Sequence, residues 1–130
     1  MGTFKFELVS PEKLLVSADA EQVVVPGSEG DFTVLEGHAP VLSTLRPGII
    51  AVRLADGKTQ QLYVQGGFAE VDPTSLTILA QQATDVASAG PDWLAAERKR
   101  AEAALAAANG DEENFYAHAA HTAITSLHLE

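Results

Sequence analysis

The sequence predicts a mainly β protein that ends in helices: an N-terminal antiparallel β-sandwich over residues 1–88 and a C-terminal antiparallel hairpin of two helices over residues 89–130. Short runs of β-type residues, separated by turn residues, fill the chain to about residue 83. A Gly-Pro-Asp sequence then ends this pattern, and strong helix formers dominate from residue 93 onward. We therefore expect two domains, with the sandwich first.

The first expected strand alternates as a strand with one wet face does. Phe4, Phe6 and Leu8 are apolar. Lys5 and Glu7 lie between them and would point to the opposite face. The later β-type runs are EQVVVPG, DFTVLEG, IIAVRLADGK, QQLYVQGGFAEVD and SLTILAQ. Short strands at this spacing favour an antiparallel sandwich or barrel.

Two turns between strands can be placed from their residues. Asp56-Gly57 separates IIAVRLA from KTQQLYV and predicts a hairpin with a type I′ turn, in which both central residues have positive φ. Asp72-Pro73 predicts the next turn, because proline pre-sets φ there and does not fit a central strand.

The helical hairpin is predicted by two helical runs on either side of Asn109-Gly110. Asp92 is placed to cap the first helix, and Gly110 to end it in the left-handed conformation. So short a turn makes the helices antiparallel. Their apolar stripes consist mostly of alanine: Leu94, Ala101, Leu105 and Ala108 on the first, and Tyr116, Ala120, Ala123 and Leu127 on the second. Buried alanine contributes far less than the roughly 1.5–3 kcal/mol of a buried Leu, Ile or Phe, so we expect the hairpin to detach more readily than the sandwich unfolds.

Composition excludes several classes of function. A formal net charge of −10 disfavours nucleic-acid binding, and the lack of cysteine excludes disulfides, thiolate zinc sites and thiol nucleophiles. No apolar run is long enough to span a bilayer, and the N-terminus does not resemble a secretory signal, so we expect a cytosol-facing protein. His118, His121 and His128 share the second helical run, where exposed histidines are a better interpretation than a metal site.

The segment 27–41, GSEGDFTVLEGHAPV, is the least ordinary part of the chain. Its glycines explain two turns around a strand but leave Glu29, Asp31 and His38 without a structural role. Ser28, Asp31 and His38 could supply a nucleophile, an acid and a base, yet no nucleophile elbow is present, and we expect no catalysis. We expect a loop that contacts a partner.

Three segments resemble the ATP synthase epsilon subunit family, called delta in mitochondria: GSEGDFTVLEGHAPVLSTLRPGII, YVQGGFAEVDPTSLTILA and the opening FELVSPEK. The resemblance implies a sandwich of about ten strands and a non-catalytic rotor subunit of a proton-translocating F-type ATP synthase, without a cofactor. In that role the β-domain packs against the gamma subunit and rests on the c ring, with ring contacts from Glu29, Asp31 and His38. It also implies a peripheral position at the cytoplasmic face of the bacterial inner membrane.

In the family, the hairpin lies folded under the β-domain or extends along gamma toward the alpha/beta catalytic head, where it hinders hydrolysis. Arg98, Lys99 and Arg100 form a basic cluster that would meet acidic surface there, or else form a solvated helix face. The second helix contains no Lys or Arg, and the family's ATP-binding motif is not matched, so we expect weak regulation and no bound ATP. The other hypotheses are a free-standing ligand-binding β-module and a small hydrolase.

Overall fold

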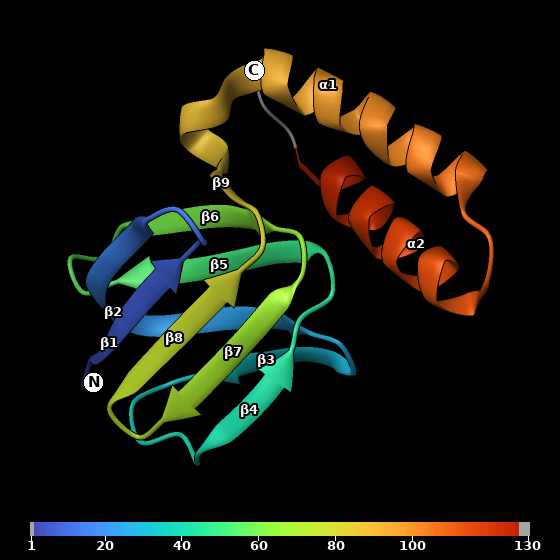
Figure 1. Ribbon diagram of the computed structural model, residues 1–130. Helices are drawn as coiled ribbons and strands as arrows, with labels where there is room; N and C mark the ends of the chain where they lie inside the picture. Colours follow the sequence, from blue (N-terminus) through green and yellow to red (C-terminus); the bar gives the residue numbers. More distant parts are fainter. Residues whose placement is uncertain (1, 128–130) are drawn as a thin grey trace.

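The computed structural model describes residues 2–127, in which nine strands precede two helices (Figure 1). The elements are β1 (Phe4–Val9), β2 (Leu14–Gly27), β3 (Gly30–Val34), β4 (Val41–Thr44), β5 (Gly48–Leu54), β6 (Thr59–Val64), β7 (Gly67–Asp72), β8 (Ser75–Ala80), β9 (Ala83–Asp85), α1 (Val86–Ala107) and α2 (Asp111–Thr125). The predicted order of a β-domain followed by two helices is confirmed. β4, β9 and the first half of β2 were not among the expected strands.

The strands form one continuous path, β4-β7-β8-β1-β2-β5-β6-β9, with β3 paired to β2. The path folds into two layers, because β2 is long enough to pair with β1 along its first half and with β5 and β3 along its second. A shift in register between Ala20 and Gln22 marks the corner. Every strand pair on this path is antiparallel except β1 with β8, which runs parallel and is joined by most of the domain rather than by a hairpin.

The core lies between the two layers. Phe6, Leu8, Val23, Ile50 and Ile78 are fully buried there, and they come from both sheets. The alternation expected of the first strand is confirmed, since its aromatic and leucine side chains point inward. Such a core excludes water along the whole length of the sandwich.

The hairpin at Asp56-Gly57 is confirmed, but its turn type differs from the prediction. Gly57 has a φ of +86°, and no residue other than glycine has positive φ in the described part of the chain. Gly57 N–H donates to the Leu54 carbonyl, and Leu54 N–H donates to that of Lys58. The loop is therefore a type I turn followed by a glycine bulge, because only one residue needs positive φ.

The turn between β7 and β8 is organised by Asp72. Asp72 pairs with Ser75 across Pro73 and Thr74. The Asp72 carboxylate accepts hydrogen bonds from the N–H groups of Thr74 and Ser75, both at 2.9 Å, and from both hydroxyls. These bonds, led by that from the Thr74 backbone, lower the pKa of Asp72.

The helix ends differ from the predictions. Gly90, with φ 83° and ψ 177°, interrupts α1, so the main helical segment begins at Pro91 and Asp92 lies within its first turn. Ala108 ends α1 in an extended conformation. Gly110 does have positive φ, but it precedes α2 with an extended ψ of 159° instead of ending α1 in the left-handed region. The hairpin turn is thus wider than a single glycine exit.

The helical hairpin packs against the outer face of β5 and β6 (Figure 1). A second apolar cluster joins the two parts: Tyr63, Val86, Leu94, Ala123, Ile124 and Leu127, with Ile49 and Trp93 partly buried beside it. The Tyr63 and Trp93 rings meet edge to face with centroids 6.0 Å apart. Neither helix in the described chain has the length and apolar character needed to cross a membrane.

Candidate partner-binding surfaces

The turn between β2 and β3 presents an acidic tip. Gly27 pairs with Gly30, and Ser28 and Glu29 form the two-residue connection. The Arg46 guanidinium donates to the Gly27 carbonyl and to the Asp31 carboxylate, so it bridges both strands at the base of the turn. The turn is therefore held from one side by a single cation.

Further bonds tie this turn to the end of β4. Ser28 N–H donates to the Thr44 carbonyl at 2.9 Å, and the two hydroxyls lie 2.7 Å apart. Arg46 N–H donates to the Pro26 carbonyl at 3.1 Å. A turn fixed by both backbone and side-chain bonds loses little further freedom on meeting a partner, which favours binding.

The three residues expected to contact the c ring differ from one another in their surroundings. Glu29 is exposed at the tip and has no hydrogen bond or ion pair among the residues described. Asp31 is also exposed, but its charge is shared with Arg46. His38 follows β3, with its ring 6.3 Å from that of Phe32 and its Nδ1 2.7 Å from the Ala39 carbonyl oxygen. The first two share one turn, and His38 lies in the next loop.

These contacts do not build a hydrolase site. The Ser28 hydroxyl bonds to Thr44, the Asp31 carboxylate to Arg46, and the His38 ring to Ala39. A nucleophile must lie within hydrogen-bond reach of its base, and this pairing is not formed within the described residues. No group of three or more potential metal ligands was found between residues 2 and 127, and His128 lies outside that range.

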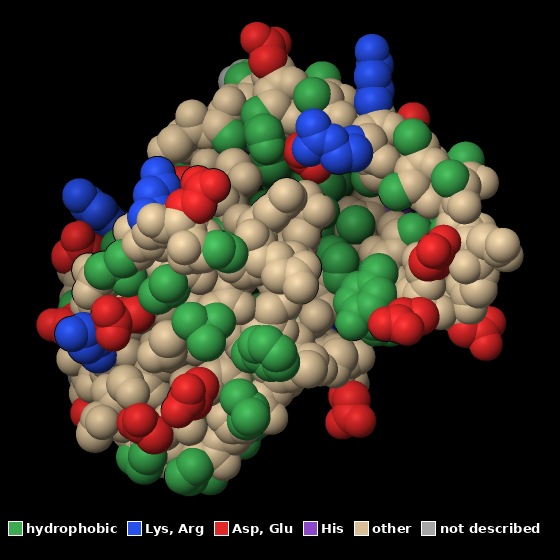
Figure 2. Space-filling model, in the orientation of Figure 1, with side chains coloured by type: hydrophobic (Ala, Val, Ile, Leu, Met, Phe, Trp, Pro, Cys, Tyr) green, Lys and Arg blue, Asp and Glu red, His purple; other side chains and the backbone are tan. Residues whose placement is uncertain are grey.

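A row of mostly apolar side chains crosses the outer face of the β4-β7-β8-β1 sheet. Registered pairs place Thr44, Phe68, Leu79, Val9 and Leu14 in line across five strands. Phe68 and Leu79 are 49% and 45% exposed. Hydrophobic side chains gather over this part of the sheet in Figure 2. We call these five residues the apolar row.

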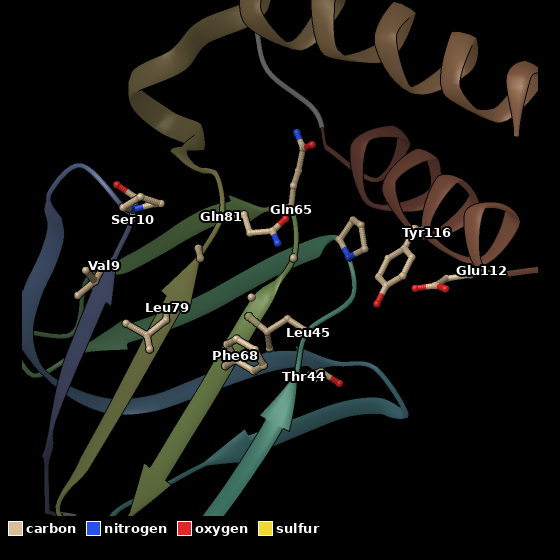
Figure 3. Close-up of a pocket in the computed structure, with 15 residues that line it drawn as sticks. Val9, Ser10, Thr44, Leu45, Gln65, Phe68, Leu79, Gln81, Glu112 and Tyr116 are labelled. Carbon is tan, nitrogen blue, oxygen red and sulfur yellow. The ribbon is translucent and has the colours of Figure 1, made fainter.

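A groove of about 900 Å³ separates one end of the apolar row from α2. Figure 3 shows Phe68 and Leu79 on neighbouring strands, and Tyr116 reaching from α2 toward the sheet with Glu112 beside it. The groove and the apolar row form one continuous surface, open to a partner larger than a small molecule.

The basic cluster on α1 is partly occupied within the hairpin. Arg98 donates to the Leu127 carbonyl at 3.2 Å, and Arg100 pairs with Glu97. Lys99 is exposed and forms no ion pair in the described part of the chain. Counting only contacts among residues 2–127, a partner would therefore meet one unpaired cation and two that already have a contact.

The sequence analysis missed three features: the apolar row, the contacts of Arg46 and the burial of Glu97. The alternation of GFAEVD and SLTILA placed Phe68 and Leu79 opposite the buried positions of their strands, and that signal could have revealed the apolar row. Arg46 and Glu97 left no comparable signal, because the pairing of Arg46 with Asp31 and the burial of Glu97 both depend on tertiary contacts.

Two solved structures resemble the fold. One is a chain of the Euglena gracilis mitochondrial ATP synthase, with a TM-score of 0.73 and 22% identity over 96% of this chain and 79% of that one. The other is from the Tetrahymena thermophila mitochondrial ATP synthase central stalk and c ring, with a TM-score of 0.62, 15% identity and 96% coverage of both chains. At these identities they support the fold alone.

Sequence comparison gives the family. Residues 3–86 match the family model described as ATP synthase, Delta/Epsilon chain, beta-sandwich domain. The ATP synthase epsilon chain of Brucella canis is 53% identical over 88 residues, which are 68% of this chain but only 65% of the relative's length. That of Brucella anthropi is 47% identical over 109 residues, or 84% of this chain and 81% of the relative. The chain therefore belongs to the ATP synthase delta/epsilon chain family.

Proposed function

We propose that this chain is a non-catalytic central-stalk subunit of a proton-translocating F-type ATP synthase, where its sandwich joins gamma to the c ring. Its matched relatives are ATP synthase epsilon chains, and the two similar folds come from ATP synthase structures. The observation that carries the proposal is the pair of contact surfaces on one sandwich: an exposed apolar row on one sheet and a clamped acidic turn at an end of the other.

We assign the apolar row to gamma. Five strands at about 4.8 Å spacing make the row about 19 Å long, which suits a helix or strand pair lying across the sheet. Leu14, Phe68 and Leu79 are all exposed within the row, and a contiguous apolar surface of this kind marks a protein contact. Leu42, 74% exposed on the next row, extends the same surface.

We assign the acidic turn and the neighbouring loop to the c ring. Glu29 and Asp31 would accept charge-assisted hydrogen bonds from basic or amide groups of the ring's polar loops, and His38 would contact them from the β3–β4 loop. The bonds from Arg46 fix the turn before contact. With these contacts, we propose that the chain is a peripheral subunit at the cytoplasmic face of a bacterial inner membrane.

We further propose that the hairpin regulates hydrolysis only weakly, through contacts of Arg98, Lys99 and Arg100 with the alpha/beta head. Two of these cations already have contacts within the hairpin. Deleting residues 89–130 in the assembled enzyme should therefore change ATP hydrolysis modestly. A many-fold activation would show that the basic cluster inhibits strongly.

The central test is co-purification with gamma and with the c ring. Phe68→Glu should abolish the gamma complex, because it places a charge in an apolar contact. Gln61→Glu adds the same charge to an exposed position on β6 of the other sheet and should leave binding intact. If the wild-type chain does not bind gamma and instead binds a nucleotide or metal at micromolar concentration, the result would favour a free-standing ligand-binding module.

A further inference from the structure

The side chain of Glu97, on α1, is buried between the hairpin and the sandwich. Glu97 is 6% exposed, and it is the only charged residue that is buried in the described part of the chain. It faces a crevice between α1 and the sandwich that Tyr63, Thr84 and Trp93 also line. Its burial therefore depends on α1 lying against β6 and β9.

The compensation for this buried charge is incomplete. The carboxylate of Glu97 pairs with Arg100 one helical turn away, but the Arg100 side chain is 67% exposed. A solvent-screened pair between helix neighbours contributes only a small fraction of the free energy lost when a carboxylate leaves water. Tyr63 lines the same crevice as Glu97. Burial, and after it the charge of Glu97, raises the pKa of Tyr63 to about 12.

We propose that Glu97 is a conformational control residue, whose buried carboxylate weakens the docking of the hairpin on the sandwich and so keeps it releasable. In the docked state Glu97 loses contact with water, while its ion-pair partner Arg100 stays mostly exposed. In the released state it regains water and keeps that partner, because Arg100 lies on the same helix. The difference favours release.

The opposite account is that the Glu97–Arg100 pair stabilises docking. The two accounts predict different signs. If the pair stabilises docking, removing either partner loosens the hairpin. If Glu97 weakens docking, Glu97→Leu tightens the hairpin, since it replaces a buried charge by an apolar side chain beside Tyr63 and Trp93. Arg100→Gln loosens the hairpin, because it removes the ion pair that partly compensates the buried charge.

The experiment is amide hydrogen exchange of α1 and α2 in the purified full chain. Glu97→Leu should slow exchange in the hairpin about tenfold relative to wild type, and Arg100→Gln should speed it. Glu102→Leu is the matched control, because it removes the same charge from an exposed position on α1 and should change exchange little. The fluorescence of Trp93, the chain's single tryptophan, is an independent measure of docking, because its ring contacts that of Tyr63 in the docked hairpin.

Two results would overturn the proposal. One is unchanged or faster hairpin exchange in Glu97→Leu while the sheet amides keep their wild-type protection. The other is equal protection of hairpin and sheet in the wild-type chain, because the hairpin would then have no separate opening to control. Neither result bears on gamma or c-ring binding, so this inference and the proposed rotor role fail separately.

Discussion

The sandwich core and the hairpin contact are built differently, although both are apolar clusters. The core brings Phe6, Leu8, Ile50 and Ile78 together from two sheets with no exposure. The hairpin contact relies on a few large side chains, on alanines and on the edge of an aromatic pair, and it includes a buried carboxylate. We therefore expect the hairpin to open more readily than the sandwich unfolds.

The largest effect should come from truncating a core side chain. Phe6→Ala should lower the free energy of unfolding by about 3–5 kcal/mol, because it leaves a cavity between the sheets. Urea denaturation followed by far-ultraviolet circular dichroism measures this loss. The matched variant Ile124→Ala, buried equally well but in the hairpin contact, should leave the sheet transition almost unchanged. Equal losses in both variants would mean that the two regions unfold as one.

The second effect is a difference in local opening within the wild-type protein. Amides of α1 and α2 should exchange at least about a hundredfold faster than those of β1 and β8, since the hairpin can open without exposing the core. Native-state exchange monitored by mass spectrometry of peptides tests this. Uniform protection would remove the distinction between the two regions.

A smaller effect should follow from releasing the acidic turn. Arg46→Ala should lower stability by about 1 kcal/mol, because the hydrogen bonds to Gly27 and Asp31 are lost from a partly exposed site. Exchange should quicken in the β2–β3 turn and not in the core. Arg53→Ala, an exposed arginine on β5, is the control. Unchanged amide exchange in the β2–β3 turn of Arg46→Ala would show that the backbone hydrogen bonds alone hold the turn.

The smallest effect concerns acid and the Asp72 turn. The pKa of Asp72 is lowered in the folded chain from its ordinary 3.8, so this carboxylate stabilises the fold above that value and stops doing so as pH falls through the lowered pKa. Asp72→Asn should therefore reduce the loss of stability as pH falls below about 4. Parallel urea titrations of both proteins at several pH values measure it. Identical stability profiles against pH in the two proteins would show that the ionised Asp72 carboxylate does not stabilise the fold.

Sequence reasoning succeeded where local chemistry decides structure. Alternation in FKFELV located a strand, and Asp56-Gly57 located a hairpin. It failed on the turn type because a three-residue loop requires positive φ only at Gly57. It missed the parallel pairing of β1 with β8, since such a pair depends on contacts between residues about 70 positions apart.

The candidate site was predicted in part. Glu29, Asp31 and His38 were selected because glycine turns left them unexplained, and the resemblance supplied their role. The sequence does not show that Arg46 binds the Asp31 carboxylate, because 15 positions separate them. Burial of Glu97 was equally hidden, since a single acid in an alanine-rich helix reads as a solvent-facing residue.

Strand β2 begins at Leu14 in the apolar row and ends at Gly27 in the acidic turn. A mechanical load applied at one surface thus reaches the other along a single covalent backbone, about 40 Å long at strand spacing, without crossing a side-chain interface. Covalent bonds do not slip under shear, whereas packed side chains can. Strand β2 is therefore a direct covalent connection between the two surfaces.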